Sequence, residues 1–187
     1  DEGFRRHIES SYNLQREGVE LIIWPEASYV NHKICGGKHP LKEGELPDFY
    51  ICIAGGCNCP ERYRKKVSEM VTPGLKIPII FGALSRREGE TRDHEFNSAF
   101  IIDEHGQVAG FYDKKYLLAF GEYIPFGETF PQLYRYSQHT GRFTPGTLLN
   151  YLPFKGWKIA PLICYEDILP FYTRALVNKT DPNLIVN

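Results

Sequence analysis

The stretch Trp157-Lys-Ile-Ala-Pro-Leu-Ile-Cys164-Tyr-Glu-Asp167 contains the pattern on which the fold and the chemistry of this chain depend. Residues 157–163 are mostly apolar and predict a buried strand. A cysteine follows this strand directly, and residues 167–178 then predict a helix. A potential nucleophile therefore lies at a strand end.

A second strand end precedes a glutamate. The run Val19-Glu-Leu-Ile-Ile-Trp24 predicts another buried strand, and Pro25 ends it, so Glu26 lies just past the strand. Strands that end at one edge of a sheet bring their following residues together, and layered α/β proteins place their sites at such edges. We therefore expect Glu26 to lie near Cys164.

A third strand end precedes a lysine. Residues 97–103 and 107–112 predict two strands joined by the turn Glu104-His105-Gly106, and Lys114 follows the second strand. The rest of the chain alternates similarly and predicts helices that cover sheet faces. We expect helices over residues 4–17 and from Pro60 to Pro73, strands over 76–82 and 183–187, a long loop or insertion over 31–59, and an extended excursion over 113–156.

Composition excludes several classes of protein. The 187 residues are 42% hydrophobic and 24% charged, as in ordinary globular domains. A formal net charge of -1 provides no basic field to attract nucleic acid, so we expect no nucleic-acid partner. No apolar run approaches the length of about 20 residues that a membrane-spanning helix needs. The given chain is expected to be soluble or to lie at a surface.

The five cysteines occur in two contexts. Cys164 stands alone, whereas the other four lie within residues 35–59. Those four are interpreted as small buried residues, or as one or two disulfides in an oxidising compartment. A metal site is less favoured, because structural zinc sites usually have longer gaps than the single residue between two of these cysteines. The four are Cys35, Cys52, Cys57 and Cys59.

Glu26, Lys114 and Cys164 together suffice for acyl transfer. A carboxylate can take the thiol proton, and an ammonium favours the thiolate and stabilises the oxyanion of a tetrahedral intermediate. Each residue alone has a plainer interpretation: an inert buried thiol, an acidic residue in the first turn of a helix, and a solvated lysine on a turn.

Three segments in this order resemble one family. Trp24-Pro-Glu-Ala-Ser28, Tyr112-Asp-Lys-Lys-Tyr-Leu117 and Ile163-Cys-Tyr-Glu-Asp167 resemble the Glu, Lys and Cys motifs of the nitrilase (carbon-nitrogen hydrolase) superfamily. Within it, Phe120-Gly-Glu-Tyr-Ile-Pro125 is most similar to a segment of the bacterial apolipoprotein N-acyltransferases. Two positions depart from that pattern: Tyr116 stands where histidine is usual and Ala119 where proline is usual.

The resemblance implies a role for each site residue. Glu26 would be the general base, Lys114 the oxyanion stabiliser and Cys164 the acyl-accepting nucleophile. The supporting residues would be Glu122 and Glu166 at two further acidic positions, Tyr165 through its backbone N–H, and Asn97 in a Phe-Asn-Ser stretch. No cofactor and no metal are implied.

The resemblance also implies a fold and a setting. The fold class would be α+β, a four-layer α-β-β-α sandwich, with residues 1–187 forming a partial domain that lacks the family's first strand, its C-terminal strands and its membrane-spanning segments. The enzyme would move a fatty acyl chain from a phospholipid donor to the N-terminal amine of a diacylated lipoprotein acceptor, at the periplasmic side of the bacterial inner membrane.

The aromatic-rich segment 119–136 suits a membrane surface, because aromatic side chains favour the membrane interface. The same segment could instead pack onto its own core. The alternative functions are a soluble nitrilase-type amidase and a non-catalytic relative that keeps the fold.

Overall fold

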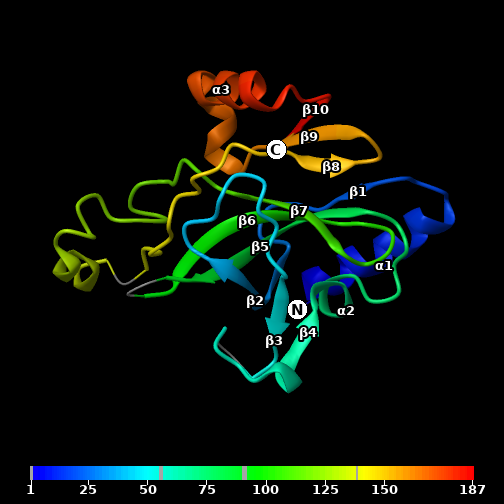
Figure 1. Ribbon diagram of the computed structural model, residues 1–187, viewed down its shortest axis with the longest axis horizontal. Helices are drawn as coiled ribbons and strands as arrows, with labels where there is room; N and C mark the ends of the chain where they lie inside the picture. Colours follow the sequence, from blue (N-terminus) through cyan, green and yellow to red (C-terminus); the bar gives the residue numbers. More distant parts are fainter. Residues whose placement is uncertain (1, 55–56, 90–91, 138) are drawn as a thin grey trace.

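The computed structural model describes residues 2–54, 57–89, 92–137 and 139–187. The chain forms four layers in the order helix, sheet, sheet, helix (Figure 1). Helices α1 (Glu2–Arg16) and α2 (Val67–Val71) cover the larger sheet, and α3 (Pro170–Thr180) covers the smaller one. The predicted α-β-β-α sandwich is confirmed.

The larger sheet has the strand order β4-β3-β2-β5-β6-β7, and β1 also pairs with β5. Strands β1 and β2 run parallel to β5 on the same side, so the chain leaves the sheet after Ile23 and rejoins it at Tyr29. Glu26 lies in this interruption. The strands are β1 (Ile22–Ile23), β2 (Tyr29–Lys38), β3 (Tyr50–Cys52), β4 (Arg64–Lys66), β5 (Ile79–Glu88), β6 (His94–Ile102) and β7 (Val108–Asp113).

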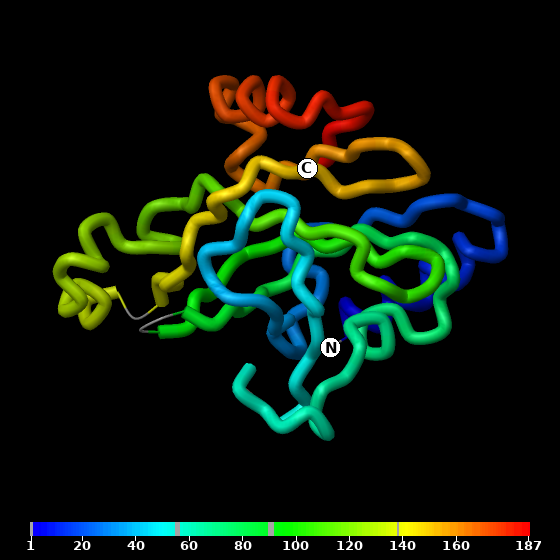
Figure 2. Tube along the Cα trace, viewed as in Figure 1, coloured from blue at the N-terminus to red at the C-terminus, as the bar shows by residue number. Residues whose placement is uncertain are grey.

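The smaller sheet has the order β10-β9-β8, with β8 (Leu152–Phe154), β9 (Trp157–Pro161) and β10 (Leu184–Val186). Strands β9 and β10 are parallel and α3 connects them, whereas β8 and β9 form an antiparallel pair. Figure 2 shows this C-terminal part, in orange and red, on one side of the larger sheet. The strand and helix expected around Cys164 are therefore present.

Two hydrophobic cores hold the layers together because the strands alternate their side chains between faces. Phe81 and Phe100 point to the helical side and pack with α1 and α2. Ile80 and Ile101, their neighbours in sequence, point to the other side and pack against the smaller sheet. Burial on both faces explains the near-continuous apolar runs of β5 and β6.

Two expectations were wrong. Residues 31–59 are not simply a loop, because they contain most of β2 and all of β3, which pair antiparallel. The helix expected from Pro60 begins only at Val67, since Arg64–Lys66 instead pair with β3 as β4. In both places pairing with distant strands overrides a weak local preference.

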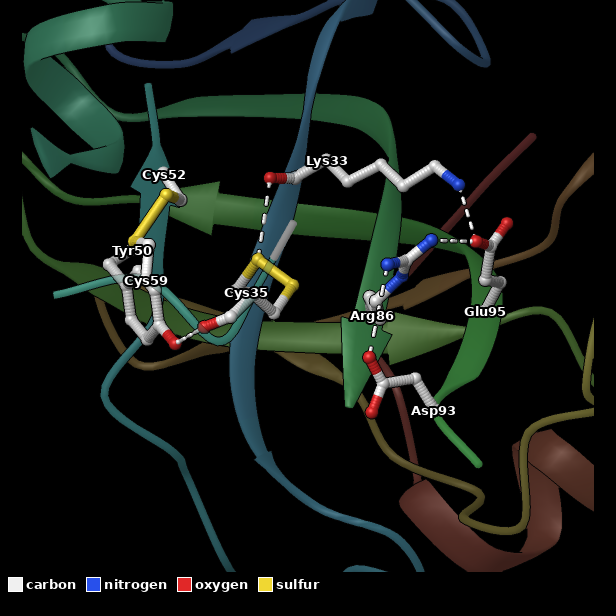
Figure 3. Close-up of a disulfide and its surroundings, with 9 residues drawn as sticks. Lys33, Cys35, Tyr50, Cys52, Cys59, Arg86, Asp93 and Glu95 are labelled. Carbon is white, nitrogen blue, oxygen red and sulfur yellow. Dashed lines mark hydrogen bonds and ion pairs between the residues drawn. A yellow bond between two sulfur atoms is a disulfide. The ribbon is translucent and has the colours of Figure 1, made fainter. Parts of the chain in front are cut away.

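Disulfides link the four clustered cysteines. Cys35 of β2 is bonded to Cys57, and Cys52 of β3 is bonded to Cys59 (Figure 3). Both bonds attach the segment after β3 to the sheet, which supports the disulfide interpretation over the metal-site one. Beside them, Arg86 of β5 contacts Glu95 and Asp93.

Among the described residues, no helix combines the length and the apolar character needed to cross a membrane.

Candidate active site

Three of the expected residues meet where β1 and β7 end, beside Asn97 in the first half of β6. Asn97 Nδ2 donates a hydrogen bond to Glu26 Oε1 at 2.7 Å, and Lys114 Nζ lies 3.9 Å from the same oxygen. The backbone N–H of Lys114 donates to the carbonyl of Asn97 at 2.8 Å. The convergence of strand ends predicted for Glu26 and Lys114 is thus present.

Lys114 is held between two carboxylates. Its Nζ lies 2.8 Å from Glu122 Oε2 and 3.9 Å from Glu26 Oε1, and only 2% of its side chain is exposed. Asn97 Nδ2 also contacts Glu122 Oε1 at 3.0 Å, and the N–H of Leu118 donates to Glu122 Oε2 at 2.8 Å. A buried ammonium needs such partners to offset the loss of hydration. Glu122 therefore belongs to the site through direct contact with Lys114.

A close approach between two backbones fixes the turn that carries Glu26. A Cβ added to Gly82 of β5 would lie 2.5 Å from the nitrogen of Ala27, so only glycine fits beneath the turn. Ser28 Oγ accepts the Gly82 N–H at 3.3 Å. Ala27 has φ of 48°, in the left-handed region that non-glycine residues seldom adopt. These contacts set the position of the carboxylate above β5.

Cys164 is the free cysteine among the described residues, and its side chain is exposed. Its φ of 52° is in the left-handed region, and such strained positions occur often at functional sites. Cys164, Glu26 and Asn97 line one cavity of about 50 Å³ between the ends of the two sheets. The structure thus brings the cysteine to the same cavity as the glutamate.

Glu166 lies behind this cavity and is fully buried. Its carboxylate accepts hydrogen bonds from Tyr112 Oη, and Tyr112 also contacts the hydroxyl of Tyr172. The backbone N–H groups of Lys115, Tyr116 and Ile163 donate to it at 2.7, 3.0 and 2.9 Å. Burial raises the pKa of Glu166, while these hydrogen bonds act in the opposite direction. Glu166 therefore fixes local backbone rather than contacting the cavity.

Tyr165 is exposed, and its backbone N–H lies in the first turn of the 3₁₀ helix Cys164–Ile168. The first N–H groups of a helix have no acceptor within the helix. This placement is compatible with donation to an oxyanion formed on a substrate bound at Cys164.

Sequence reasoning missed several residues that support the site. Tyr112 donates to the Glu166 carboxylate and contacts the hydroxyl of Tyr172, and Arg87 forms a buried ion pair with Asp113, the residue before Lys114. Each belongs to a regular strand or helix, and no spacing rule links partners so distant in sequence. Within the described ranges, no group of three or more His, Cys, Asp or Glu side chains is arranged to hold a metal ion.

Comparison with known proteins identifies the family. The family model for carbon-nitrogen hydrolase matches residues 1–187, and the chain belongs to this family, the nitrilase superfamily. Two curated relatives are called apolipoprotein N-acyltransferase. The one from Geobacter metallireducens is 29% identical over 90% of this chain, and the one from Bradyrhizobium diazoefficiens is 40% identical over 80%. The chain spans only 27% and 24% of their lengths.

Solved structures confirm the fold. A mutant of the amidase from Nesterenkonia sp. AN1, with an acetamide moiety covalently attached at its active site cysteine, matches 98% of this chain and 57% of its own with a TM-score of 0.57 at 17% identity. A glutamine-dependent NAD+ synthetase from Acinetobacter baumannii matches all of this chain and 29% of its own, with a TM-score of 0.57 at 17% identity. The chain therefore has a nitrilase-type fold.

Proposed function

We propose that this chain provides the catalytic site of an apolipoprotein N-acyltransferase, with Cys164 as nucleophile, Glu26 as general base and Lys114 as oxyanion stabiliser. The observation that carries the proposal is the 2.8 Å ion pair between Lys114 and Glu122. Glu122 belongs to the Phe120-Gly-Glu-Tyr-Ile-Pro125 segment that resembles the acyltransferases, so this segment is part of the site rather than a neighbouring loop.

The first half-reaction would use the shared cavity. Glu26 takes the thiol proton, and the thiolate of Cys164 attacks the ester carbonyl carbon of a phospholipid. Lys114 and the N–H of Tyr165 stabilise the resulting oxyanion. The carbon–oxygen bond then breaks, and Glu26 returns the proton to the departing lysophospholipid alkoxide. The product is a thioester on Cys164.

The second half-reaction would pass the acyl chain to the amine of a diacylated lipoprotein. The amine nitrogen attacks the thioester carbonyl, and Glu26 takes one of its protons. The carbon–sulfur bond breaks, an amide is released, and the proton on Glu26 returns to the thiolate of Cys164. No redox cofactor is needed, because neither step changes an oxidation state.

Two features of the surface support a setting at the outer side of a membrane. Several apolar side chains of the segment 118–136 are exposed, and aromatic side chains favour membrane interfaces. The two disulfides indicate an oxidising compartment, as the bacterial periplasm is. We therefore propose the periplasmic side of the inner membrane as the location. The exposed side chains are Leu118, Phe120, Phe126, Phe130 and Tyr136.

The test follows the acyl group. The protein is mixed with vesicles whose phospholipid has a labelled acyl chain, and a hydroxylamine-sensitive label on Cys164 is measured by mass mapping. A lipopeptide with a free N-terminal amine should then remove the label as an amide. Cys164→Ser is the matched control that should give neither product.

The competing functions give different results. Hydrolysis of small amides without any labelling by phospholipid would identify a soluble amidase instead. A non-catalytic relative would show neither activity, and iodoacetamide near neutral pH would not alkylate Cys164 selectively.

A further inference from the structure

A buried polar cluster lies on the reverse side of the strand ends that carry the site. Successive residues of a strand point to opposite faces, so Lys114 and Asp113 face opposite sides of the larger sheet. Lys114 faces Glu26 and Glu122, whereas Asp113 faces Arg87 of β5. The catalytic side chains on one face and the polar cluster on the other therefore share the same backbone.

Hydrogen bonds hold the Asp113 carboxylate to β6, the neighbouring strand, and to β5, the strand beyond it. Arg87 Nη2 donates to Asp113 Oδ1 at 3.0 Å, and Arg87 Nη1 lies 2.9 Å from Asp113 Oδ2. Ser98 Oγ of β6 donates to Asp113 Oδ1 at 2.7 Å. Because Ser98 has one hydroxyl proton, Ser85 must be the donor in the 2.7 Å contact between the two serines. Residues from β5, β6 and β7 are thereby connected.

Aromatic rings pack around Arg87. Its side chain is fully buried, and its guanidinium lies 4.4 Å from the ring centroid of Phe96 and 4.9 Å from that of Phe111. A buried ion pair adds little net stability compared with well-packed apolar residues of similar volume. Planar two-point pairing by arginine does, however, fix the orientation of a carboxylate. The presence of the Arg87–Asp113 ion pair is therefore better explained by the orientation that it gives to Asp113 than by added stability.

The fixed orientation of Asp113 restricts the position of Lys114, because the two residues are consecutive in the backbone. Asp113 is bonded directly to Lys114 in the chain, the Lys114 N–H donates to Asn97, and the Lys114 carbonyl accepts the N–H of Gly146 at 2.8 Å. We infer that Arg87 and Asp113 are positioning residues, which hold the end of β7 so that the Lys114 ammonium stays beside Glu26 and Glu122. This inference rests on the roles proposed above for Lys114 and Cys164.

The test distinguishes a displaced Lys114 side chain from a general loss of folding stability. Arg87→Met alone would leave an unpaired buried carboxylate and would destabilise the fold, so Arg87→Met is combined with Asp113→Leu to restore an apolar filling. The ratio of the Cys164 alkylation rate at about pH 7 to that at about pH 10 reports how strongly nearby charge favours the thiolate. We expect the double variant to melt close to the parent temperature, with this ratio and the labelling by phospholipid both reduced at least about fivefold.

Two comparisons make the result decisive. Arg86→Met is the matched control, because Arg86 pairs with Glu95 and Asp93 (Figure 3), whereas the neighbouring Arg87 pairs with Asp113. It should keep the parent ratio. A double variant that recovers both stability and the parent ratio would overturn the positioning role. If Lys114→Met itself leaves both the ratio and the labelling by phospholipid unchanged, the proposed role of Lys114 fails first, and the positioning role fails with it.

Discussion

The Oε2 atom of Glu166 accepts the backbone N–H of Ile163 at 2.9 Å, one residue before Cys164. The Oε1 atom of the same carboxylate accepts the N–H groups of Lys115 and Tyr116 at 2.7 and 3.0 Å, directly after Lys114. One buried side chain thus joins the segment that carries the candidate nucleophile to the segment that carries the candidate oxyanion stabiliser. The two reactive groups are held relative to each other by a residue that touches neither.

Glu166→Gln should separate these segments. An amide nitrogen in place of Oε2 would face the N–H of Ile163, so donor would meet donor and that hydrogen bond would be lost. A hydrogen bond to a charged group contributes about 1.5–3 kcal/mol, and we expect a loss of this size in the free energy of unfolding measured with urea. Labelling of Cys164 by phospholipid should fall as well.

Asp167→Asn is the matched control for Glu166→Gln. Asp167 is the next residue, is exposed, and accepts a hydrogen bond from Asn187 at the surface. Its loss should change stability by less than about 0.5 kcal/mol. Unaltered stability and labelling in Glu166→Gln would contradict the joining role.

Gly82→Ala should displace the candidate base. The added methyl group would lie 2.5 Å from the backbone nitrogen of Ala27, and the turn that carries Glu26 would have to move outward. A displacement of about 1 Å at a catalytic group can cost about a hundredfold in rate. We expect labelling of Cys164 to fall by about that factor while the circular dichroism spectrum keeps its shape.

Ala83→Gly serves as the control for Gly82→Ala. Ala83 is the next residue of β5 and is fully buried, and loss of its methyl group weakens the strand without pushing the turn. It should lower the melting temperature with little effect on labelling per folded molecule. Equal losses of activity in the two variants would indicate general destabilisation rather than a displaced Glu26.

The sequence predicted those features that local pattern determines. Apolar runs identified the strands before Glu26, Lys114 and Cys164, and their common edge brought the first two into contact. The strand β2 was missed, because Gly36 and Gly37 interrupt its alternation and its partners come from distant parts of the chain. The ion pair between Arg87 and Asp113 was missed for the same reason, since no periodicity relates residues on two different strands.

Stability should fall on mild acidification through two histidines whose ring centroids lie 4.4 Å apart, His39 and His94. Burial lowers the pKa of His39 and of His94; His94 lowers the pKa of His39 further, and Arg92 lowers that of His94. Below an ordinary histidine pKa of about 6.5, the unfolded chain therefore binds more protons than the folded one. The two neutral histidines therefore contribute stability above about pH 6.5, and this contribution is lost as the pH falls from there toward their lowered pKa values in the folded chain.

The groups that face His39 are His94, Arg87 and Asp113, of which Asp113 raises its pKa and the other two lower it. Urea unfolding at about pH 7.5 and pH 5.5 should show lower stability at the acidic pH. The pair His39→Gln and His94→Gln should make this difference smaller. His105→Gln, at an exposed turn, should not. A difference that the double variant leaves intact would assign the acid sensitivity to other groups.

The exposed aromatic side chains of the segment 118–136 should bind membranes. Phe126 and Phe130 are 77% and 50% exposed, so two large apolar rings are in contact with water. Burial of a phenylalanine side chain in an apolar phase contributes about 1.5–3 kcal/mol. Phe126→Ser with Phe130→Ser should therefore weaken partition of the protein onto phospholipid vesicles by at least about tenfold in a sedimentation assay.

Trp157→Ser is the matched control, because Trp157 is 55% exposed but begins β9, on the other side of the molecule from this segment (Figure 1). If the control loses as much binding as the double variant, contact is non-specific and the segment is not the membrane-facing surface.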